Sequence, residues 1–247
     1  HVIEINILGT RAVLQVASRY RKKVLLASTS EIYGKSEQIP FREEDDRVVG
    51  PSTKARWSYS ASKAVDEFLG LAYHRQLGLP VVVFRLFNTI GPRQTGQYGM
   101  VVPRFVSQAL ARQPLTVYGD GSQTRCFLHV VDAVEAIMAL AGSPRAVGEV
   151  FNVGSTDEIS ILELAKKVLA LVDARRIDGV GDAGGRRAAT NGRITLVPYE
   201  QAYEAGFEDM QRRVPDISKI HSHVGWKPSR SLDETLKDII SHFTVSS

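Results

Sequence analysis

Tyr59 and Lys63 are two residues whose types and spacing suit catalysis. A separation of four residues places both side chains on one face of a helix, one turn apart. An ammonium group held beside a phenol favours the phenolate, because the opposite charge lowers the phenol pKa. A tyrosine tuned in this way can take the proton of a sugar hydroxyl. The same pair occurs by chance on many surface helices, so the rest of the sequence has to support this interpretation.

About 30 residues before Tyr59 the chain carries a polar run, Ser28-Thr29-Ser30-Glu31. This run follows the apolar residues 23–27, which predict a buried strand. The carboxyl ends of parallel strands gather at one edge of a sheet, where ligands bind. We therefore expect the Thr29 hydroxyl to bond the same substrate oxygen that Tyr59 deprotonates.

Apolar periodicity and the positions of glycine and proline predict helices that alternate with strands. Helices are expected at 1–20, 57–77, 102–112, 132–140, 161–171, after residue 216 and at 231–243, and strands at 23–27, 81–87, 115–118, 150–153 and 194–197. Asp132 is expected to cap the helix that it begins. Such alternation implies an α/β fold with a doubly wound parallel sheet that helices cover on both faces.

The composition is that of an ordinary globular protein. Of 247 residues, 43% are hydrophobic and 23% are charged, which excludes a disordered or collagen-like chain. The net charge of +4 is explained by an anionic small molecule as well as by nucleic acid, and no nucleic-acid partner is expected. No apolar run reaches the roughly 18 residues of a membrane span. The single cysteine, Cys126, excludes a cysteine-only metal site and suits a reducing, cytoplasmic location.

Seven short motifs follow one another along nearly the whole chain. They are NILGT at 6–10, STSEIYG at 28–34, YSASK at 59–63, RLFN at 85–88, GPR at 91–93, YGDGSQTR at 118–125 and RVPD at 213–216. With this set and order, the sequence resembles the extended short-chain dehydrogenase/reductases that modify nucleotide sugars.

The resemblance implies a Rossmann-like domain that holds NAD and a smaller carboxyl-terminal lobe that holds a nucleoside diphosphate. Residues 1–90 would form the last part of the NAD-binding domain. Residues 91–247 would form mainly the nucleotide-sugar lobe, and segments around 129–153 would return to the first domain. Two copies would pair through the helices at 3–20 and 57–77, which gives a homodimer.

The resemblance also implies roles for single residues. Tyr59 would be the catalytic base and would touch the cofactor with Lys63, which binds the nicotinamide ribose, and with Ser28. Thr29 would orient the sugar, and Ser30 and Glu31 would complete the catalytic set. The substrate-binding residues would be Asn88, Arg93, Arg104, Arg125 and Arg213. Asn88 and Arg125 would contact the diphosphate, which favours charge-assisted donors. No metal is expected.

Members of this family begin with a strand, a glycine-rich turn and a helix that bind the pyrophosphate of NAD. No such segment precedes Asn6. The run GVGDAG at 179–184 fits G-x-G-x-x-G but follows no predicted strand, so we expect a loop there. We expect the front of the molecule to lie outside this sequence. The alternatives are a truncated product and a non-catalytic nucleotide-sugar-binding module.

The residues beside the sugar distinguish the reactions of this family. A 4,6-dehydratase has Asp where this chain has Ser30, so acid-catalysed loss of water lacks its donor. Thr29-Ser30-Glu31 is similar to nucleotide-glucuronate decarboxylases, and Arg213 matches an arginine of the same enzymes. Oxidation at C4 of a UDP-linked uronate gives a β-keto acid, which loses carbon dioxide readily. We therefore expect a UDP-glucuronate decarboxylase-like enzyme, with a UDP-sugar 4-epimerase as a close alternative because Trp57-Ser58-Tyr59 and residues 95–105 also resemble epimerases.

Overall fold

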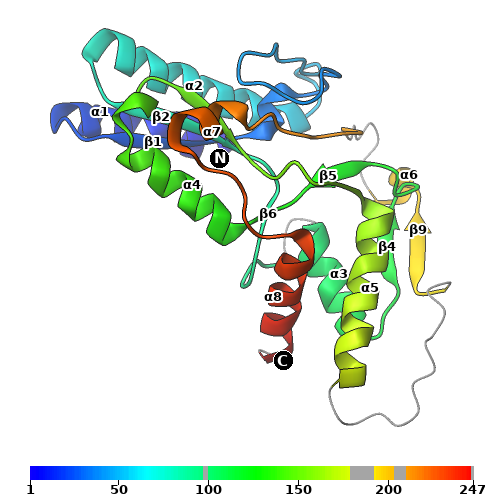
Figure 1. The fold of residues 1–247 in the computed structure, drawn as a ribbon. Coiled ribbons are helices and arrows are strands. Elements are labelled where there is room, and N and C mark those ends of the chain that lie inside the picture. Colours follow the sequence, from blue (N-terminus) through cyan, green and yellow to red (C-terminus); the bar gives the residue numbers. More distant parts are fainter. Residues whose placement is uncertain (97–99, 179–191, 203–209, 246–247) are drawn as a thin grey trace. The chain divides into compact units, whose positions relative to one another are not determined.

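The computed structural model describes residues 1–96, 100–178, 192–202 and 210–245 (Figure 1). The glycine run at 179–184 lies outside the described residues. The chain forms two compact units, each discontinuous in sequence. The first unit comprises His1–Thr89, Cys126–Thr156 and Arg212–Ser229, and the second comprises Ile90–Arg125, Asp157–Gln211 and Arg230–Ser247. The expected division placed residues 212–229 with the second lobe, whereas they cluster with the first unit.

The first unit is built on a three-stranded parallel sheet in the order β1-β2-β7. Its strands are β1 (Val24–Thr29), β2 (Val81–Leu86) and β7 (Val150–Val153). In register, Leu26 of β1 lies beside Val83 of β2. The central strand β2 is buried almost throughout, which explains why its sequence is apolar except for Arg85. The α/β class with a parallel sheet, predicted from the sequence, is confirmed.

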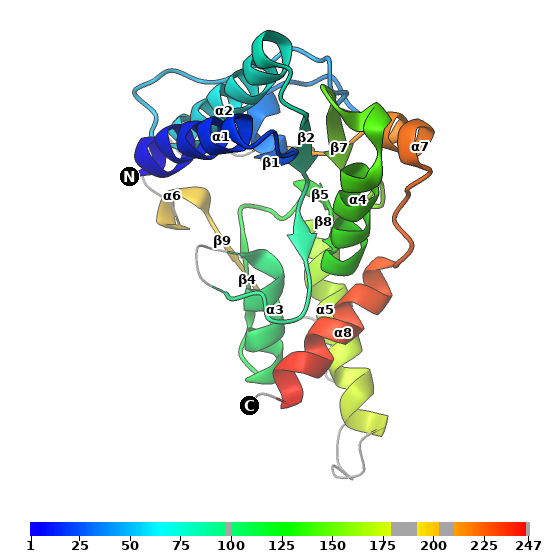
Figure 2. The same ribbon diagram turned by 90° about the vertical axis from the view of Figure 1, so that its left-hand side faces the viewer.

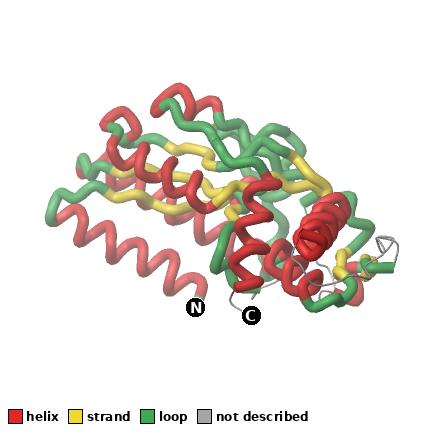
Figure 3. The backbone as a smooth tube through the Cα atoms, turned by 60° about the horizontal axis from the view of Figure 1, so that its bottom comes forward, coloured by secondary structure: helices red, strands yellow, loops and turns green. Residues whose placement is uncertain are grey.

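Helices cover both faces of this sheet (Figure 3). One face packs against α1 (Gly9–Arg19), which continues the π-helical turn η1 (Glu4–Leu8), and against α2 (Arg56–Leu77). The other face packs against α4 (Val130–Gly142) and α7 (Ser218–Val224). The side chains of β2 alternate between the two cores, because successive residues of a strand point to opposite faces.

Two helix ends show how the sequence sets these boundaries. Gly78 ends α2 in the left-handed conformation (φ 67°), and its N–H donates to the carbonyl of His74 at 2.9 Å. The prediction that Asp132 caps α4 is wrong. The ring Nδ1 of His129 accepts the hydrogen bond of the Val131 N–H, and the buried Asp132 instead accepts hydrogen bonds from Ser229.

The second unit consists of three packed helices and short strand pairs (Figure 2). Its elements are α3 (Val101–Leu110), β4 (Leu115–Tyr118), β5 (Thr124–Cys126), β8 (Glu158–Ser160), α5 (Ile161–Asp178), β9 (Ile194–Val197), α6 (Tyr199–Ala202) and α8 (Leu232–Val245). The shorter elements of the chain are η2 (Ser30–Tyr33), β3 (Thr89–Ile90), β6 (Leu128–His129) and η4 (Pro144–Ala146). Within the described residues, no helix is long and apolar enough to cross a membrane.

Candidate active site

The turn after β1 holds the polar run of the sequence. Thr29 ends the strand in an extended conformation and caps η2, and its Oγ1 accepts a hydrogen bond from the N–H of Glu31 at 3.2 Å. This cap turns the chain so that Ser30 is buried while Glu31 stays partly exposed. The run therefore lies at the carboxyl end of β1, the edge where ligands bind in a parallel sheet.

Tyr59 lies in the first part of α2, which packs against β1 and η2. A hydrogen bond joins its side chain to that of Thr29. Tyr59 as a whole is 43% exposed. The structure thus brings Thr29 and Tyr59 together, although 30 residues separate them in the sequence.

The ammonium of Lys63 is bound to a carboxylate of its own helix. It lies 2.9 Å from a carboxylate oxygen of Asp66, one turn further along α2. The pKa of Tyr59 is raised, mainly by burial and further by the charges of Glu31 and Asp66, while the Thr29 hydrogen bond lowers it. In this structure Asp66 holds the ammonium, and the tuning of Tyr59 by Lys63 stays a prediction.

Two arginines converge on Glu31. The guanidinium of Arg213 lies 2.7 Å from Oε1, and that of Arg56 lies 3.7 Å from Oε2. Arg213 also donates to the hydroxyl of Ser30 at 3.4 Å. Arg56 was not among the site residues predicted from the sequence, although a signal existed. Arg56 precedes Tyr59 by three residues, and a helix brings such neighbours to the same face.

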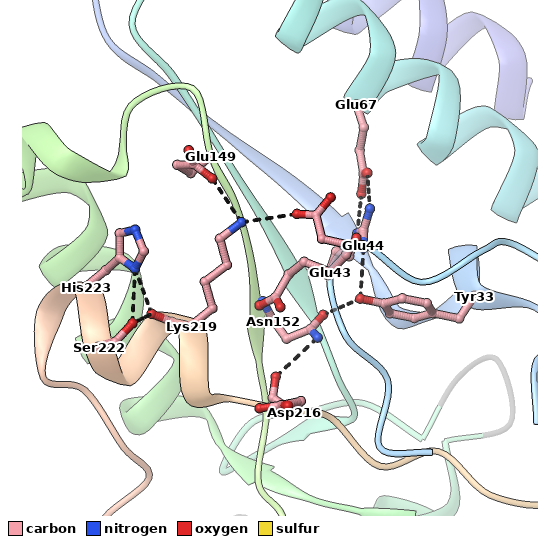
Figure 4. A network of polar contacts seen from close by, with 11 residues as sticks. Tyr33, Glu43, Glu44, Glu67, Glu149, Asn152, Asp216, Lys219, Ser222 and His223 are labelled. Atoms are coloured by element: carbon pink, nitrogen blue, oxygen red, sulfur yellow. Dashed lines mark hydrogen bonds and ion pairs between the residues drawn. The ribbon is translucent and has the colours of Figure 1, made fainter. Parts of the chain in front are cut away.

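A buried hydrogen-bond network fixes the turn that carries Ser30 and Glu31 (Figure 4). The hydroxyl of Tyr33, the last residue of η2, donates to Oδ1 of Asn152 on β7 at 2.7 Å and accepts from Arg85 on β2 at 2.8 Å. Arg85 also binds both carboxylate oxygens of Glu67 on α2, at 3.0 and 2.8 Å. Burial raises the pKa of Tyr33 to about 12, so its hydroxyl keeps the proton that it donates.

The same network places Arg213. The backbone of the following residues pairs with Phe41, since the Phe41 N–H donates to the Val214 carbonyl and the Asp216 N–H donates to the Phe41 carbonyl, each at 2.8 Å. The amide of Asn152 donates to both the Phe41 and the Asp216 carbonyl. Arg213 thus reaches Glu31 from a segment fixed by backbone hydrogen bonds, although it is distant in sequence.

The other predicted site residues are placed as follows. In the first unit, Ser28 is buried and its Oγ has no hydrogen-bond partner among the described residues. The Asn88 amide donates to the Cys126 carbonyl at 3.3 Å. Arg93, Arg104 and Arg125 belong to the second unit.

The arginines of the second unit contact their own surroundings. Arg104 donates to the Thr116 carbonyl at 3.1 Å and lies over the Tyr118 ring, 4.2 Å from its centroid. Arg125 donates to the Thr124 carbonyl at 2.7 Å. Arg93 is exposed and has a left-handed backbone with φ 69°.

Three polar side chains of the first unit are suited to binding a nicotinamide ribose. Tyr59 and Lys63 present a hydroxyl and an ammonium on one helix face, and the Ser28 Oγ is a buried polar atom that lacks a partner. These groups fit the hydroxyls of a ribose. Within the described residues, no glycine-rich turn links a strand to a helix as a pyrophosphate site requires. The described residues therefore fit the nicotinamide end of a dinucleotide. They also contain no group of three potential metal ligands.

Comparison with known sequences gives one family and consistent relatives. The family model described as GDP-mannose 4,6 dehydratase matches residues 1–239. A UDP-N-acetyl-alpha-D-glucosaminuronate decarboxylase of Bacillus cytotoxicus is 43% identical over 243 residues, which cover 98% of this chain and 70% of that protein. UDP-glucuronic acid decarboxylase 1 of Arabidopsis thaliana is 37% identical over 241 residues, 98% of this chain and 50% of the plant protein. The chain thus spans between half and 70% of these relatives.

Solved structures with the same fold include two with bound NAD. A dTDP-glucose 4,6-dehydratase of Bacillus anthracis in complex with NAD is 26% identical, with a TM-score of 0.80 over 98% of this chain and 68% of its own. A UDP-glucuronic acid 4-epimerase of Bacillus cereus in complex with UDP-glucuronic acid and NAD is 25% identical, with a TM-score of 0.79 over 99% of this chain and 69% of its own.

Proposed function

The chain belongs to the GDP-mannose 4,6 dehydratase family, the extended short-chain dehydrogenase/reductases that modify nucleotide sugars, and from this premise we propose that it serves the decarboxylation of a UDP-linked uronate. The observation that carries this proposal is the pair of guanidinium groups around one carboxylate, that of Glu31, beside the Tyr59–Thr29 hydroxyl pair. Two arginines that hold a carboxylate of the protein suit a substrate carboxylate equally well.

The first step is oxidation at C4 of the sugar. Tyr59 takes the proton of the C4 hydroxyl, and Thr29 holds the same oxygen in place through its own hydroxyl. NAD, when bound, supplies the acceptor for the hydride that leaves C4. Ser28 and Lys63 would hold the ribose of its nicotinamide end.

The second step is loss of the carboxylate. The 4-keto product is a β-keto acid, so the bond between C5 and the carboxyl carbon breaks, carbon dioxide leaves, and C5 takes up a proton. Return to C4 of the hydride removed in the first step, with a proton from Tyr59 to the C4 oxygen, would then give the UDP-pentose. Arg213 and Arg56 would bind the carboxylate beforehand through charge-assisted hydrogen bonds, which fix its orientation. Ser30 lies within reach of the Arg213 guanidinium and would complete this subsite.

A 4-epimerase acting on the same uronate is the second candidate. The solved UDP-glucuronic acid 4-epimerase shares the fold of this chain, and oxidation at C4 by Tyr59 serves both reactions. An epimerase retains the carboxylate, returns the hydride to the other face of C4 and releases no carbon dioxide. The two proposals therefore differ in the fate of a single carbon atom.

We propose in addition that two copies associate through η1, α1 and α2. Large apolar side chains on these helices are exposed in the single chain. They are Ile5, Leu8, Val13, Val16, Val65 and Phe68. Apolar side chains gathered on neighbouring helices are typical of a surface that another chain covers.

Incubation of the protein with NAD and either UDP-glucuronate or UDP-N-acetylglucosaminuronate tests the activity. Release of carbon dioxide with formation of a UDP-pentose supports decarboxylation. A UDP-uronate of inverted C4 configuration, formed without carbon loss, would support the epimerase instead. Tight binding of the UDP-sugar without turnover at any NAD concentration would point to a binding module. A Tyr59→Phe variant is the control for chemistry, since it retains the ring but has no proton acceptor.

A further inference from the structure

Asp66 carries a buried charge that the proposed chemistry does not use. It is fully buried on α2, and one carboxylate oxygen binds the Lys63 ammonium at 2.9 Å. The other oxygen, Oδ1, has no hydrogen-bond partner among the described residues. The neighbouring carboxylate of Glu67 differs, because Arg85 binds both of its oxygens. Acidic side chains are rarely buried without full pairing, so the position of Asp66 calls for an explanation.

Tyr59, Lys63 and Asp66 follow one another along one face of α2. The separations of four and three residues place Lys63 between the phenol and the carboxylate, one turn from each. A lysine side chain is long and flexible enough to turn toward either neighbour. In this structure the ammonium is bound to Asp66, at 2.9 Å from its carboxylate.

We propose that Asp66 is a positioning residue that competes with Tyr59 for the Lys63 ammonium. While Asp66 holds the ammonium, Tyr59 keeps its proton and is a poor base. When the ammonium turns toward Tyr59, the phenolate becomes accessible at lower pH and the carboxylate of Asp66 loses its partner. This inference rests on the proposed role of Tyr59 as the base.

Among the charged groups around Tyr59, Asp66 is the one that is paired with Lys63. From η2, Glu31 faces Tyr59, but two arginines compensate its charge. From β1, the Thr29 hydroxyl reaches it as a neutral group. In the described part of the chain, Lys63 is the only ionic partner of Asp66, and no ion pair joins Asp66 to η1, α1 or β2. Removal of the Asp66 charge therefore releases Lys63 and leaves the other pairs intact.

The test is a titration of the Tyr59 phenol in Asp66→Asn, which keeps the shape of the side chain and removes its charge. Phenolate absorbance is followed against pH in the purified protein without substrate. The chain has eight tyrosines, so the same titration of the matching Tyr59→Phe variant is subtracted. We expect the midpoint of Tyr59 to fall by about one pH unit or more, the usual effect of an ammonium brought close to a phenol. Glu4→Gln, which removes an exposed carboxylate of η1, should leave the midpoint unchanged.

A second pair of variants separates competition for Lys63 from a direct effect of the Asp66 charge. In a Lys63→Met background no ammonium remains to be released. The proposal therefore predicts that Asp66→Asn shifts the midpoint there by less than half of its effect in the parent. Equal shifts in both backgrounds, or an unchanged midpoint in the parent background, would overturn the competition.

Folding of the variants is followed by thermal unfolding. If Asp66→Asn does not fold, Asp66→Ala takes its place with the same expected fall of the midpoint. These titrations involve no sugar, so a failure of the decarboxylase proposal leaves their outcome unaffected. Conversely, if the parent protein decarboxylates its substrate but Asp66→Asn leaves the Tyr59 midpoint unchanged, only the proposed role of Asp66 is contradicted.

Discussion

Arg213 is a buried arginine whose guanidinium group meets a carboxylate and a hydroxyl rather than water. A guanidinium presents its donors in a rigid plane and can bind both oxygens of a carboxylate, whereas an ammonium acts as a point charge. Arg56 lies further from Glu31 and is more exposed, so water screens its charge more strongly. The two arginines should therefore contribute unequally to the binding of a uronate.

We predict that Arg213→Lys lowers kcat/KM for UDP-glucuronate about 100-fold, the size of effect seen when one fixed donor is removed from an active site. Arg56→Lys should lower it less than about 10-fold. Steady-state rates and ligand titrations measure both effects. UDP-glucose, which has no carboxylate, is the control ligand, and its Kd should change little. An equal loss of affinity for UDP-glucose would show that Arg213 supports the fold of the site and does not read the carboxylate.

Glu43 belongs to the same hydrogen-bond network, and its protonation should make the stability of the folded state depend on pH (Figure 4). Its carboxylate accepts a hydrogen bond from the Asn152 N–H at 2.7 Å. Burial raises its pKa above the ordinary value of 4.5, although the Asn152 hydrogen bond and Lys219 act in the opposite direction. The folded state therefore holds the Glu43 proton more tightly than the unfolded state, and stability falls as the pH rises above 4.5.

We predict that this loss disappears in Glu43→Gln, whose side-chain carbonyl can still accept the Asn152 hydrogen bond. The free energy of unfolding of the parent, relative to the variant, should decline between pH 4.5 and 7. The decline should stay below about 1 kcal/mol, because water screens a partly exposed charge. Urea unfolding at several pH values measures it. A parent that gains stability relative to the variant over this range would contradict the raised pKa.

At the scale of elements, α1 and α2 each present one side to the sheet and another to solvent, and η1 packs against both helices. Leu14 and Ala17 of α1 are buried, while Val13 and Val16 of the same helix are exposed. On α2, the exposed Phe68 is the largest apolar side chain of the proposed contact. A helix with two apolar sides normally packs against two partners.

Phe68→Glu should therefore dissociate a dimer. A charge placed in a desolvated contact should raise the dimer Kd by about 100-fold or more, and light scattering after size exclusion measures the change. Met138→Glu is the matched control, because Met138 is also exposed, 66% against 61% for Phe68, but lies on α4 at the other face of the sheet. Dissociation by Met138→Glu but not by Phe68→Glu would place the contact on α4.

The elements of the first unit were largely predictable from local patterns. The apolar run of β2 and the glycine that ends α2 determine their boundaries by themselves. The start of α4 was less predictable, because both His129 and Asp132 can cap a helix, and in the structure His129 caps it while Asp132 binds Ser229. The π-helical turn η1 has no distinct sequence signal.

The active-site cluster was predictable where its members lie within one motif, and less so elsewhere. Thr29, Ser30 and Glu31 share a turn, so one strand end places all three. Arg213 was expected only through the family resemblance, since no local pattern connects it with Glu31. The bond between Lys63 and Asp66 could not be foreseen, because helical spacing allows Lys63 to turn in either direction and burial of Asp66 decides the outcome.

At the scale of the whole molecule, the discontinuous units explain how one short segment serves the site. The chain leaves the first unit after Thr89 and returns twice, and the last return, Arg212–Ser229, carries Arg213. Arg93, Arg104 and Arg125, three of the expected substrate-binding residues, belong to the second unit, and Arg125 is among those expected to contact the diphosphate. If Arg125 binds the diphosphate and Lys63 binds the nicotinamide ribose, the two ligands are bound by different parts of the chain. Their binding can then be measured separately.

We predict that UDP stabilises this chain more than NAD does. A ligand at 100 times its Kd adds about 2.7 kcal/mol to the stability of the part that binds it, which corresponds to several degrees in Tm. The described residues fit only the nicotinamide end of NAD, so its effect should be smaller at equal concentration. Thermal unfolding with UDP, uridine or NAD measures these shifts, and uridine controls for the base alone. Arg125→Gln should remove the UDP shift, since a diphosphate needs a charged donor there. A shift of Tm with NAD but not with UDP would contradict the placement of the nucleotide site in the second unit, because only the first unit would then bind a ligand.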